Sequence, residues 1–271
     1  MLGAVPSSSF SRQLSPGRER KTVTTFQANL ANPFPAQNSF KWTPNAPGRN
    51  GTLIAVVLDE SGSMSSVRDS TIAGLNEFVQ AQAASEGAGE AYLTVIKFDA
   101  PSIKPLCENQ LVTSMRPFTR SDYQPNGGTN LMDAIGYTLN RVNGVLESVP
   151  AAERPGVLVV IITDGHENSS QEYNSSQIKE MVKLAEAQDW TFTFLGANVD
   201  AFTMGGSFGM GASNTVNYST ASMGDTMQVL SKMTTTVRMA KSAGVTTADL
   251  YASQSLYDAS DRARAMDKTN A

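Results

Sequence analysis

One stretch of the chain decides the fold, the apolar run Leu53-Ile54-Ala55-Val56-Val57-Leu58 followed at once by Asp59-Glu60-Ser61-Gly62-Ser63-Met64. An unbroken apolar run of this length predicts a strand buried on both faces, as in the centre of a parallel sheet. The Asp, Ser and Gly residues after it are turn formers. We therefore expect a buried strand that ends in a tight turn and directs a carboxylate and two hydroxyls at one point.

Strand and helix patterns alternate outward from this stretch. The run at 157–162 is also wholly apolar, and the segments 131–146 and 176–188 repeat apolar residues at helical spacing. We expect strands at 53–58, 91–98, 102–107, 157–162, 190–195 and 215–218, and helices at 67–84, 131–146, 176–188 and 225–243. This alternation predicts an α/β fold with a doubly wound, mostly parallel sheet flanked by helices.

Polar side chains gather at the predicted strand ends. Asp59 and Asp164 each follow an apolar strand, Thr129 lies just before a helix, and Ser61 and Ser63 stand two apart in the turn. In open α/β sheets, ligands bind at the carboxyl ends of the strands, so these side chains are expected to converge. Carboxylate and hydroxyl oxygens are hard donors, which favours Mg²⁺, or else Mn²⁺ or Ca²⁺, over zinc.

The three segments together resemble the metal-ion-dependent adhesion site (MIDAS) of von Willebrand factor type A (vWA) domains. The pattern is Asp-x-Ser-x-Ser at 59–63, then Gly127-Gly128-Thr129-Asn130, then Thr163-Asp164-Gly165. The resemblance covers roughly 52–244, includes the segments 131–135 and 194–202, and is nearest to stand-alone vWA proteins of bacteria and their phages.

The resemblance also implies a role for each matching residue. It makes Ser61, Ser63 and Thr129 direct metal ligands, with Asp59 and Asp164 acting through water. It further implies a Rossmann-like fold and a non-catalytic adhesion function, in which a protein partner presents an Asp or Glu carboxylate to the ion.

Two enzyme motifs offer alternatives to this interpretation. The segment Gly205-Gly206-Ser207-Phe208-Gly209 matches the nucleophile elbow of serine hydrolases, which requires a later histidine. The only histidine, His166, precedes Ser207, so we expect a flexible glycine loop there. A phosphatase with Asp-x-Asp at the first strand is excluded because Ser61 replaces the second aspartate, and the chain contains no phosphate-binding loop motif. We therefore predict that the protein is not an enzyme.

The ends of the chain differ from its body. Residues 1–50 contain six prolines and carry six basic side chains against one acid, so they contribute +5 and the remainder −9 to the net charge of −4. This predicts a basic, Pro-rich extended arm at 1–50, a vWA domain at 51–244, and an interaction tail at 245–271 with a weakly amphipathic helix. The arms suggest self-assembly or a larger complex, and the acidic body argues against nucleic-acid binding.

The cysteine content and the apolar patterns of the sequence limit the expected cellular location. Cys107 is the only cysteine, which excludes an internal disulfide and fits a reducing compartment. We find neither a signal-peptide pattern nor an apolar run of membrane-spanning length, so the expected location is the cytoplasm or a virion assembled there. An alternative function is therefore a structural component of a larger particle, such as a phage virion or tail, which uses the terminal arms. A weaker alternative is a cytoplasmic partner in a bacterial stress or signalling operon.

Overall fold

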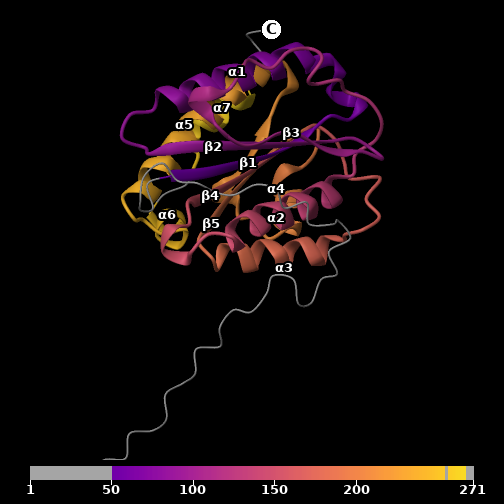
Figure 1. Ribbon diagram of the computed structural model, residues 1–271. Helices are drawn as coiled ribbons and strands as arrows, with labels where there is room; N and C mark the ends of the chain where they lie inside the picture. Colours follow the sequence, from indigo (N-terminus) through magenta and orange to yellow (C-terminus); the bar gives the residue numbers. More distant parts are fainter. Residues whose placement is uncertain (1–50, 254–255, 267–271) are drawn as a thin grey trace, which may run out of the picture. The chain divides into compact units, whose positions relative to one another are not determined.

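The computed structural model describes residues 51–253 and 256–266, so the predictions for 1–50 and 267–271 lie outside the described residues. One six-stranded sheet forms the centre, in the order β3-β2-β1-β4-β5-β6 (Figure 1). Its strands are β1 (Gly51–Asp59), β2 (Glu90–Phe98), β3 (Ile103–Leu111), β4 (Gly156–Thr163), β5 (Trp190–Ala197) and β6 (Thr215–Tyr218). All neighbouring pairs are parallel except β2 and β3. The predicted fold class is confirmed.

The order of the strands places the switch point of the sheet beside β1. The chain passes from β1 outward to β2 and β3, then returns to the other side of β1 with β4. In the register, Leu58 of β1 lies between Lys97 of β2 and Ile162 of β4. The carboxyl ends of β1 and β4 therefore meet at the position where open α/β sheets bind their ligands.

Helices cover both faces of the sheet. In Figure 1, α1, α5 and α7 lie on one side and α2, α3 and α4 on the other. The helices are α1 (Arg68–Ala84), α2 (Leu131–Glu147), α3 (Ser175–Glu186), α4 (Ala201–Ser207), α5 (Met223–Ser242), α6 (Thr247–Ser253) and α7 (Ala259–Met266). Short 3₁₀ helices occur at Gly62–Val67, Val112–Ser114, Ala151–Glu153, Ala212–Asn214 and Thr220–Ser222. None of the helices in the described ranges has the length and apolar character needed to cross a membrane.

The apolar core explains this layering. Ile54, Val56 and Leu58 alternate along β1 and join one buried cluster with residues of α1 and α5. Alternate strand residues point to opposite faces, so the remaining apolar residues of β1 face the other helix layer. β1 is buried along nearly its whole length for this reason.

Two segments differ from expectation. The edge strand β3 reaches Leu111, beyond the predicted 102–107, and its pairing with β2 shifts register twice. The expected flexible glycine loop is wrong, because Gly205 and Gly206 lie inside α4. Asp200 begins this helix by accepting a hydrogen bond from the Thr203 amide at 3.1 Å. A side chain at Gly205 would lie 3.0 Å from Thr215 Oγ1, so glycine lets the helix approach β6 closely.

The described part of 245–271 packs on the domain core. Leu250, Leu256 and Tyr257 are buried in the same cluster as the sheet residues. The Tyr257 hydroxyl lies 2.8 Å from Thr193 Oγ1 of β5. These residues thus take part in the packing of the domain, and the interaction role of the tail stays a prediction.

Candidate metal centre

The residues of the candidate metal centre come from three segments at the carboxyl edge of the sheet. Asp59 is the last residue of β1, Ser61 comes just before the 3₁₀ helix Gly62–Val67, and Ser63 lies in the first turn of that helix. Thr129 lies two residues before α2, and Asp164 follows the last residue of β4. The structure therefore brings all the predicted ligands to the switch point between β1 and β4.

A chain of hydrogen bonds links Asp59 to Asp164. The Ser61 amide donates to Asp59 Oδ1 at 2.7 Å, and Ser61 Oγ lies 3.1 Å from Ser63 Oγ. Ser63 Oγ donates to Asp164 Oδ1 at 2.6 Å. The turn after β1 and the end of β4 are thus joined through side chains of the predicted ligands.

Gly165 marks the point on which the oxygens converge. A methyl group placed on its Cα would lie 3.1 Å from Thr129 Oγ1, 3.7 Å from Ser63 Oγ and 3.9 Å from Asp59 Oδ2. These oxygens come from two segments, 59–63 and 127–130, and they surround one small space beside Gly165 of the third segment. Hydroxyl and carboxylate oxygens are ligands that suit a hard divalent cation, so the donor set fits such an ion.

Both carboxylates are buried and have no ion pair with a basic side chain of the described residues. Asp59 is fully buried and Asp164 nearly so. Burial raises the pKa of the Asp59 carboxyl; hydrogen bonds from Ser61 and Thr163 oppose the rise, and the charge of Asp164 adds to it. Burial also raises the pKa of Asp164, while the Ser63 hydroxyl lowers it. A bound divalent cation would offset the cost of burying these two charges.

Neighbouring side chains hold the ligands in place. Thr163 Oγ1 donates to Asp59 Oδ2 at 2.5 Å, and the Tyr123 hydroxyl donates to the Asp59 carbonyl at 2.5 Å. Asn168 Oδ1 accepts from the Thr129 amide at 2.9 Å. These three supporting roles are not among those predicted from the sequence. The position of Thr163 next to Asp164 was a usable signal for one of them, whereas nothing local pointed to Tyr123.

The residues of the rejected enzyme motifs do not form a second centre. Ser207 is the last residue of α4, and its hydroxyl donates to the Met204 carbonyl at 2.7 Å. His166 is exposed on the loop after β4. Within residues 51–253 and 256–266, no group of three or more His, Cys, Asp or Glu side chains is arranged to hold a metal. The candidate metal centre is not such a group, because it has two carboxylates and its other donors are hydroxyls.

Comparisons with known proteins give distant likenesses only. No family model and no curated protein sequence matches the chain. Proximal thread matrix protein 1 from the mussel byssus is 15% identical with a TM-score of 0.46, over 69% of this chain and 48% of that one. A second structure of that protein, with a zinc-occupied MIDAS motif, is 14% identical with the same TM-score.

A manganese-loaded TRAP protein of Plasmodium vivax is 15% identical with a TM-score of 0.45, over 65% of this chain and 72% of that one. The chain spans about half the length of the mussel protein (48%).

Proposed function

We propose that this chain is a protein-binding module that acts through a divalent cation, in the manner of vWA domains. The cation, Mg²⁺ in the first instance and Mn²⁺ or Ca²⁺ as alternatives, is held by Asp59, Ser61, Ser63, Thr129 and Asp164. A protein partner contributes an Asp or Glu carboxylate to it. The observation that carries the proposal is the convergence of Thr129 Oγ1, Ser63 Oγ and Asp59 Oδ2 around Gly165.

The hydrogen bonds support a division of labour among these residues. Both oxygens of Asp59 already accept a bond, Oδ1 from the Ser61 amide and Oδ2 from the Thr163 hydroxyl. Each oxygen keeps a further lone pair that can accept a bond from a metal-bound water, the role that the resemblance to vWA domains implies for Asp59. Ser61, Ser63 and Thr129 are neutral ligands, so the ion keeps the electrophilic character that a partner carboxylate requires.

The absence of catalysis is part of the proposal. The centre consists of hydroxyls and carboxylates that bond to one another or to the backbone. The single histidine of the sequence, His166, precedes Ser207, the order opposite to that of the hydrolase triad. A bound cation would supply an attachment point for an anionic group of a protein. The surrounding residues would hold the cation in place.

The first experiment is isothermal titration of the full chain with Mg²⁺, Mn²⁺ and Ca²⁺. Wild-type protein is expected to bind with saturation, and Asp59→Ala is expected to lose about tenfold or more in affinity because the ligand shell loses its hydrogen-bonded carboxylate. Asp249→Ala is the matched control, since Asp249 is an exposed acid in the first turn of α6, which packs near the start of β5. Equal affinity in the wild type and Asp59→Ala would refute the assigned site.

A second titration tests the open position for a partner. Acetate added to the Mn²⁺-loaded chain is expected to displace bound water and to lower the water-proton relaxation rate. The Asp59→Ala variant should not show the change at the same Mn²⁺ concentration. Unchanged relaxation in the wild type at saturating acetate would contradict carboxylate recognition by the ion.

The charge contrast along the chain favours a second hypothesis. Residues 1–50 carry +5 while the remainder carries −9, a distribution suited to contacts between copies of the chain. Assembly into a larger particle, such as a phage virion or tail, would use the terminal arms in place of the metal centre. Chelator should abolish partner binding under the first hypothesis and leave assembly intact under the second.

A further inference from the structure

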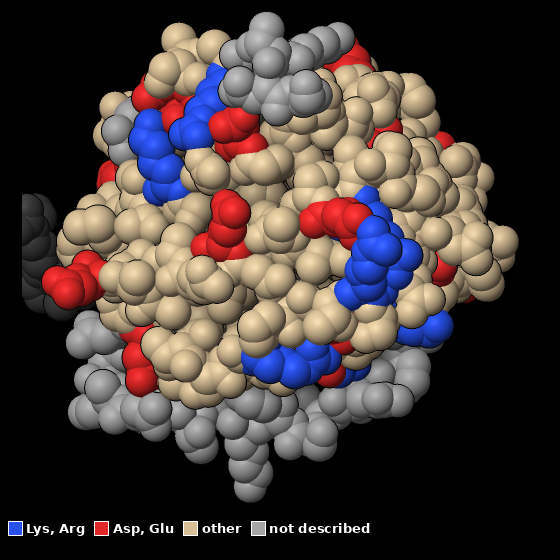
Figure 2. Space-filling model, turned by 90° about the horizontal axis from the view of Figure 1, so that it is seen from above, with Lys and Arg blue, Asp and Glu red and all other residues tan. Residues whose placement is uncertain are grey.

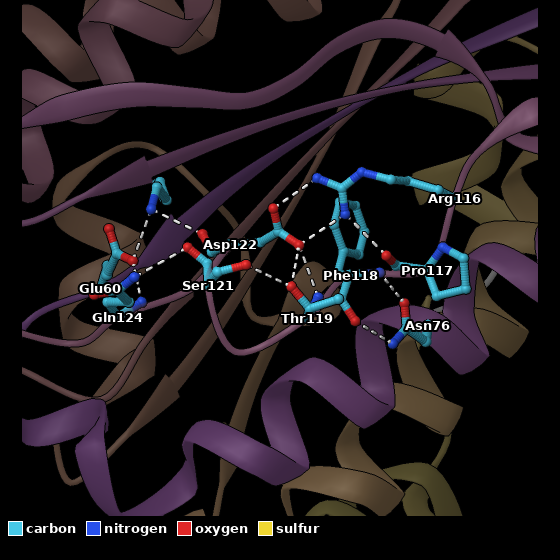
Figure 3. A network of polar contacts seen from close by, with 10 residues as sticks. Glu60, Asn76, Arg116, Pro117, Phe118, Thr119, Ser121, Asp122 and Gln124 are labelled. Carbon is cyan, nitrogen blue, oxygen red and sulfur yellow. Dashed lines mark hydrogen bonds and ion pairs between the residues drawn. The ribbon is translucent and has the colours of Figure 1, made fainter.

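Glu60 lies between two predicted ligands in the sequence, but the partners of its carboxylate are residues outside the candidate metal centre. Its Oε1 accepts a hydrogen bond from the Gln124 amide at 2.5 Å and forms an ion pair with Lys97 Nζ at 2.9 Å. Figure 3 shows Glu60 beside Gln124, at one end of a polar network that includes Asp122 and Arg116. Glu60 therefore meets the loop that leads to Thr129.

Lys97 of β2 also forms a hydrogen bond with this loop. Its ammonium group donates to Glu60 and also to the Asp122 carbonyl at 2.8 Å. The Glu60 side chain is 8% exposed and that of Lys97 17%, so the pair is largely shielded from water. A shielded ion pair that also satisfies backbone groups holds its geometry more firmly than an exposed one.

The backbone of Glu60 adds two further contacts. Its amide donates to the Phe98 carbonyl at 2.7 Å, and its carbonyl accepts from the Asn126 amide at 2.8 Å. One residue thus ties the end of β1 to β2 and to loop positions 124 and 126. The side chain and the main chain of Glu60 act on the same short segment.

The segment between Asn126 and Thr129 has little freedom of its own. Gly127 accepts a hydrogen bond from the Gly62 amide at 3.1 Å, and Gly128 accepts one from the Ala100 amide at 3.0 Å. Gly127 has φ of +66°, and a side chain there would lie 2.6 Å from the Ala100 carbonyl oxygen. The chain is therefore held by hydrogen bonds at Gln124, Asn126, Gly127 and Gly128, up to the residue before Thr129.

We infer that Glu60 and Lys97 are positioning residues for the metal centre, because their ion pair sets the place of the loop that carries the Thr129 hydroxyl. The inference rests on the proposed function, since Thr129 is a ligand only if the centre binds a cation. The positive charge of Lys97 also balances the negative charge of Glu60. Without it a third negative charge would lie beside Asp59 and Asp164 and would repel the incoming carboxylate.

The outer half of the same loop offers a matched control. Asn76 of α1 exchanges two hydrogen bonds with the backbone of Phe118, at 2.7 and 3.0 Å (Figure 3). Arg120 pairs with Asp69 of α1, and both side chains are well exposed. These contacts hold 116–121 against α1 and have no direct link to the predicted ligands.

Cation titration of the full chain tests the positioning role. Glu60→Ala removes both side-chain contacts and is expected to weaken binding about tenfold or more, the effect typical of residues that orient metal ligands. Glu60→Gln keeps an oxygen for the Gln124 amide and should lose less than Glu60→Ala. Arg120→Met should remain within about twofold of the wild type, since exposed ion pairs contribute little.

Amide hydrogen exchange in chelator provides a readout that needs no bound metal. Protection of 122–129 is expected to fall in Glu60→Ala and to be retained in Arg120→Met, while β4 stays protected in both. Thermal unfolding establishes that each variant is folded at the titration temperature. Glu60→Gln, which is nearly isosteric, serves as the test variant if Glu60→Ala does not fold.

The two ideas fail in different ways. Failure of the proposed function would appear in the wild type as absence of cation binding. Failure of the inference would appear in Glu60→Ala as wild-type affinity together with unchanged exchange of 122–129. Weaker binding with lower protection of 122–129, and no such effects in Arg120→Met, would support the positioning role.

Discussion

At the scale of single residues, Gly165 controls whether the candidate metal centre can exist. Oxygens of Thr129, Ser63 and Asp59 lie around the position that a Cβ at this residue would occupy, and glycine leaves that space open. Gly165 is not among the glycines with positive φ, so alanine can adopt its backbone conformation. A substitution there changes the space at the centre without straining the chain.

Gly165→Ala is therefore expected to separate cation binding from folding. The added methyl group would lie 3.1 Å from Thr129 Oγ1 and would displace ligands, so cation affinity should fall about tenfold or more. The free energy of unfolding in chelator should change by no more than about 1 kcal/mol, because no apolar core contact is lost. Titration calorimetry and denaturant unfolding measure the two quantities.

Gly206→Ala is the control for this change. Nothing lies within 4 Å of a methyl group at Gly206, which is inside α4. Alanine should stabilise that helix by about 0.5–1 kcal/mol and leave cation affinity unaltered. Normal affinity in Gly165→Ala would show that the oxygens around it are not the ligands.

At the scale of elements, α1 and α5 pack closely and are joined by a buried arginine side chain. A methyl group at Gly74 of α1 would lie 2.5 Å from Met227 Cγ of α5, so the helices touch along this line. Farther along, Arg238 of α5 is 1% exposed. It donates to the Gln82 carbonyl at 2.8 Å and to the Gly89 carbonyl at 2.7 Å.

Arg238 acts as a cap for the end of α1. The last carbonyls of a helix lack partners within the helix and carry the negative end of its dipole, which favours a cation. Burial lowers the pKa of the guanidinium, yet arginine remains charged. Arg238 therefore joins α5 to the end of α1 through polar contacts inside an apolar layer.

Arg238→Met is expected to destabilise the fold by about 2 kcal/mol, because the buried carbonyls lose their donors while part of the packing is kept. Denaturant unfolding in chelator measures the effect. Cation affinity should stay at the wild-type value, since Arg238 lies in the α1–α5 layer and bonds to none of the predicted ligands. The neighbouring Met239 is 52% exposed, and Met239→Ala should change stability by about 0.5 kcal/mol or less. Wild-type stability in Arg238→Met would rule out the capping role.

At the scale of the whole molecule, charge is distributed differently on the body and in residues 1–50. On the face seen in Figure 2, most Lys and Arg side chains lie beside acidic ones and do not gather into a basic patch. Among the described residues, Lys232 pairs with Asp258 and Asp261, and Arg264 pairs with Asp225. The excess of positive charge is thus a property of residues 1–50 in the sequence.

Deletion of residues 1–50 tests what that segment contributes. The core cluster of the described residues is made by side chains from Ile54 onward, so the shortened chain should fold with the wild-type thermal midpoint and cation affinity. Sedimentation at several concentrations compares self-association with that of the full chain. Loss of assembly on deletion would favour the particle hypothesis, and loss of folding would show that residues 1–50 complete the core.

Much of the architecture followed from local patterns in the sequence. Apolar runs at 53–58 and 157–162 predicted the central strands β1 and β4, because a strand buried on both faces needs apolar side chains in succession. The positions of Asp59 and Asp164 just after these strands then predicted that their carboxylates would meet. The first inference depends only on residues close together in the chain, and the second adds only the rule that open α/β sheets bind their ligands at the carboxyl ends of their strands.

Tertiary structure decided the rest. The close approach of α4 to β6, the packing of α6 and α7, and the direction of the Glu60 side chain follow from contacts with distant residues. Glu60 has the same local sequence whether it faces the metal centre or Lys97. A buried carboxylate needs a partner, and the residues next to Glu60 in the sequence do not supply one. The pairing of β1 with β2 brings the Lys97 ammonium group to Glu60.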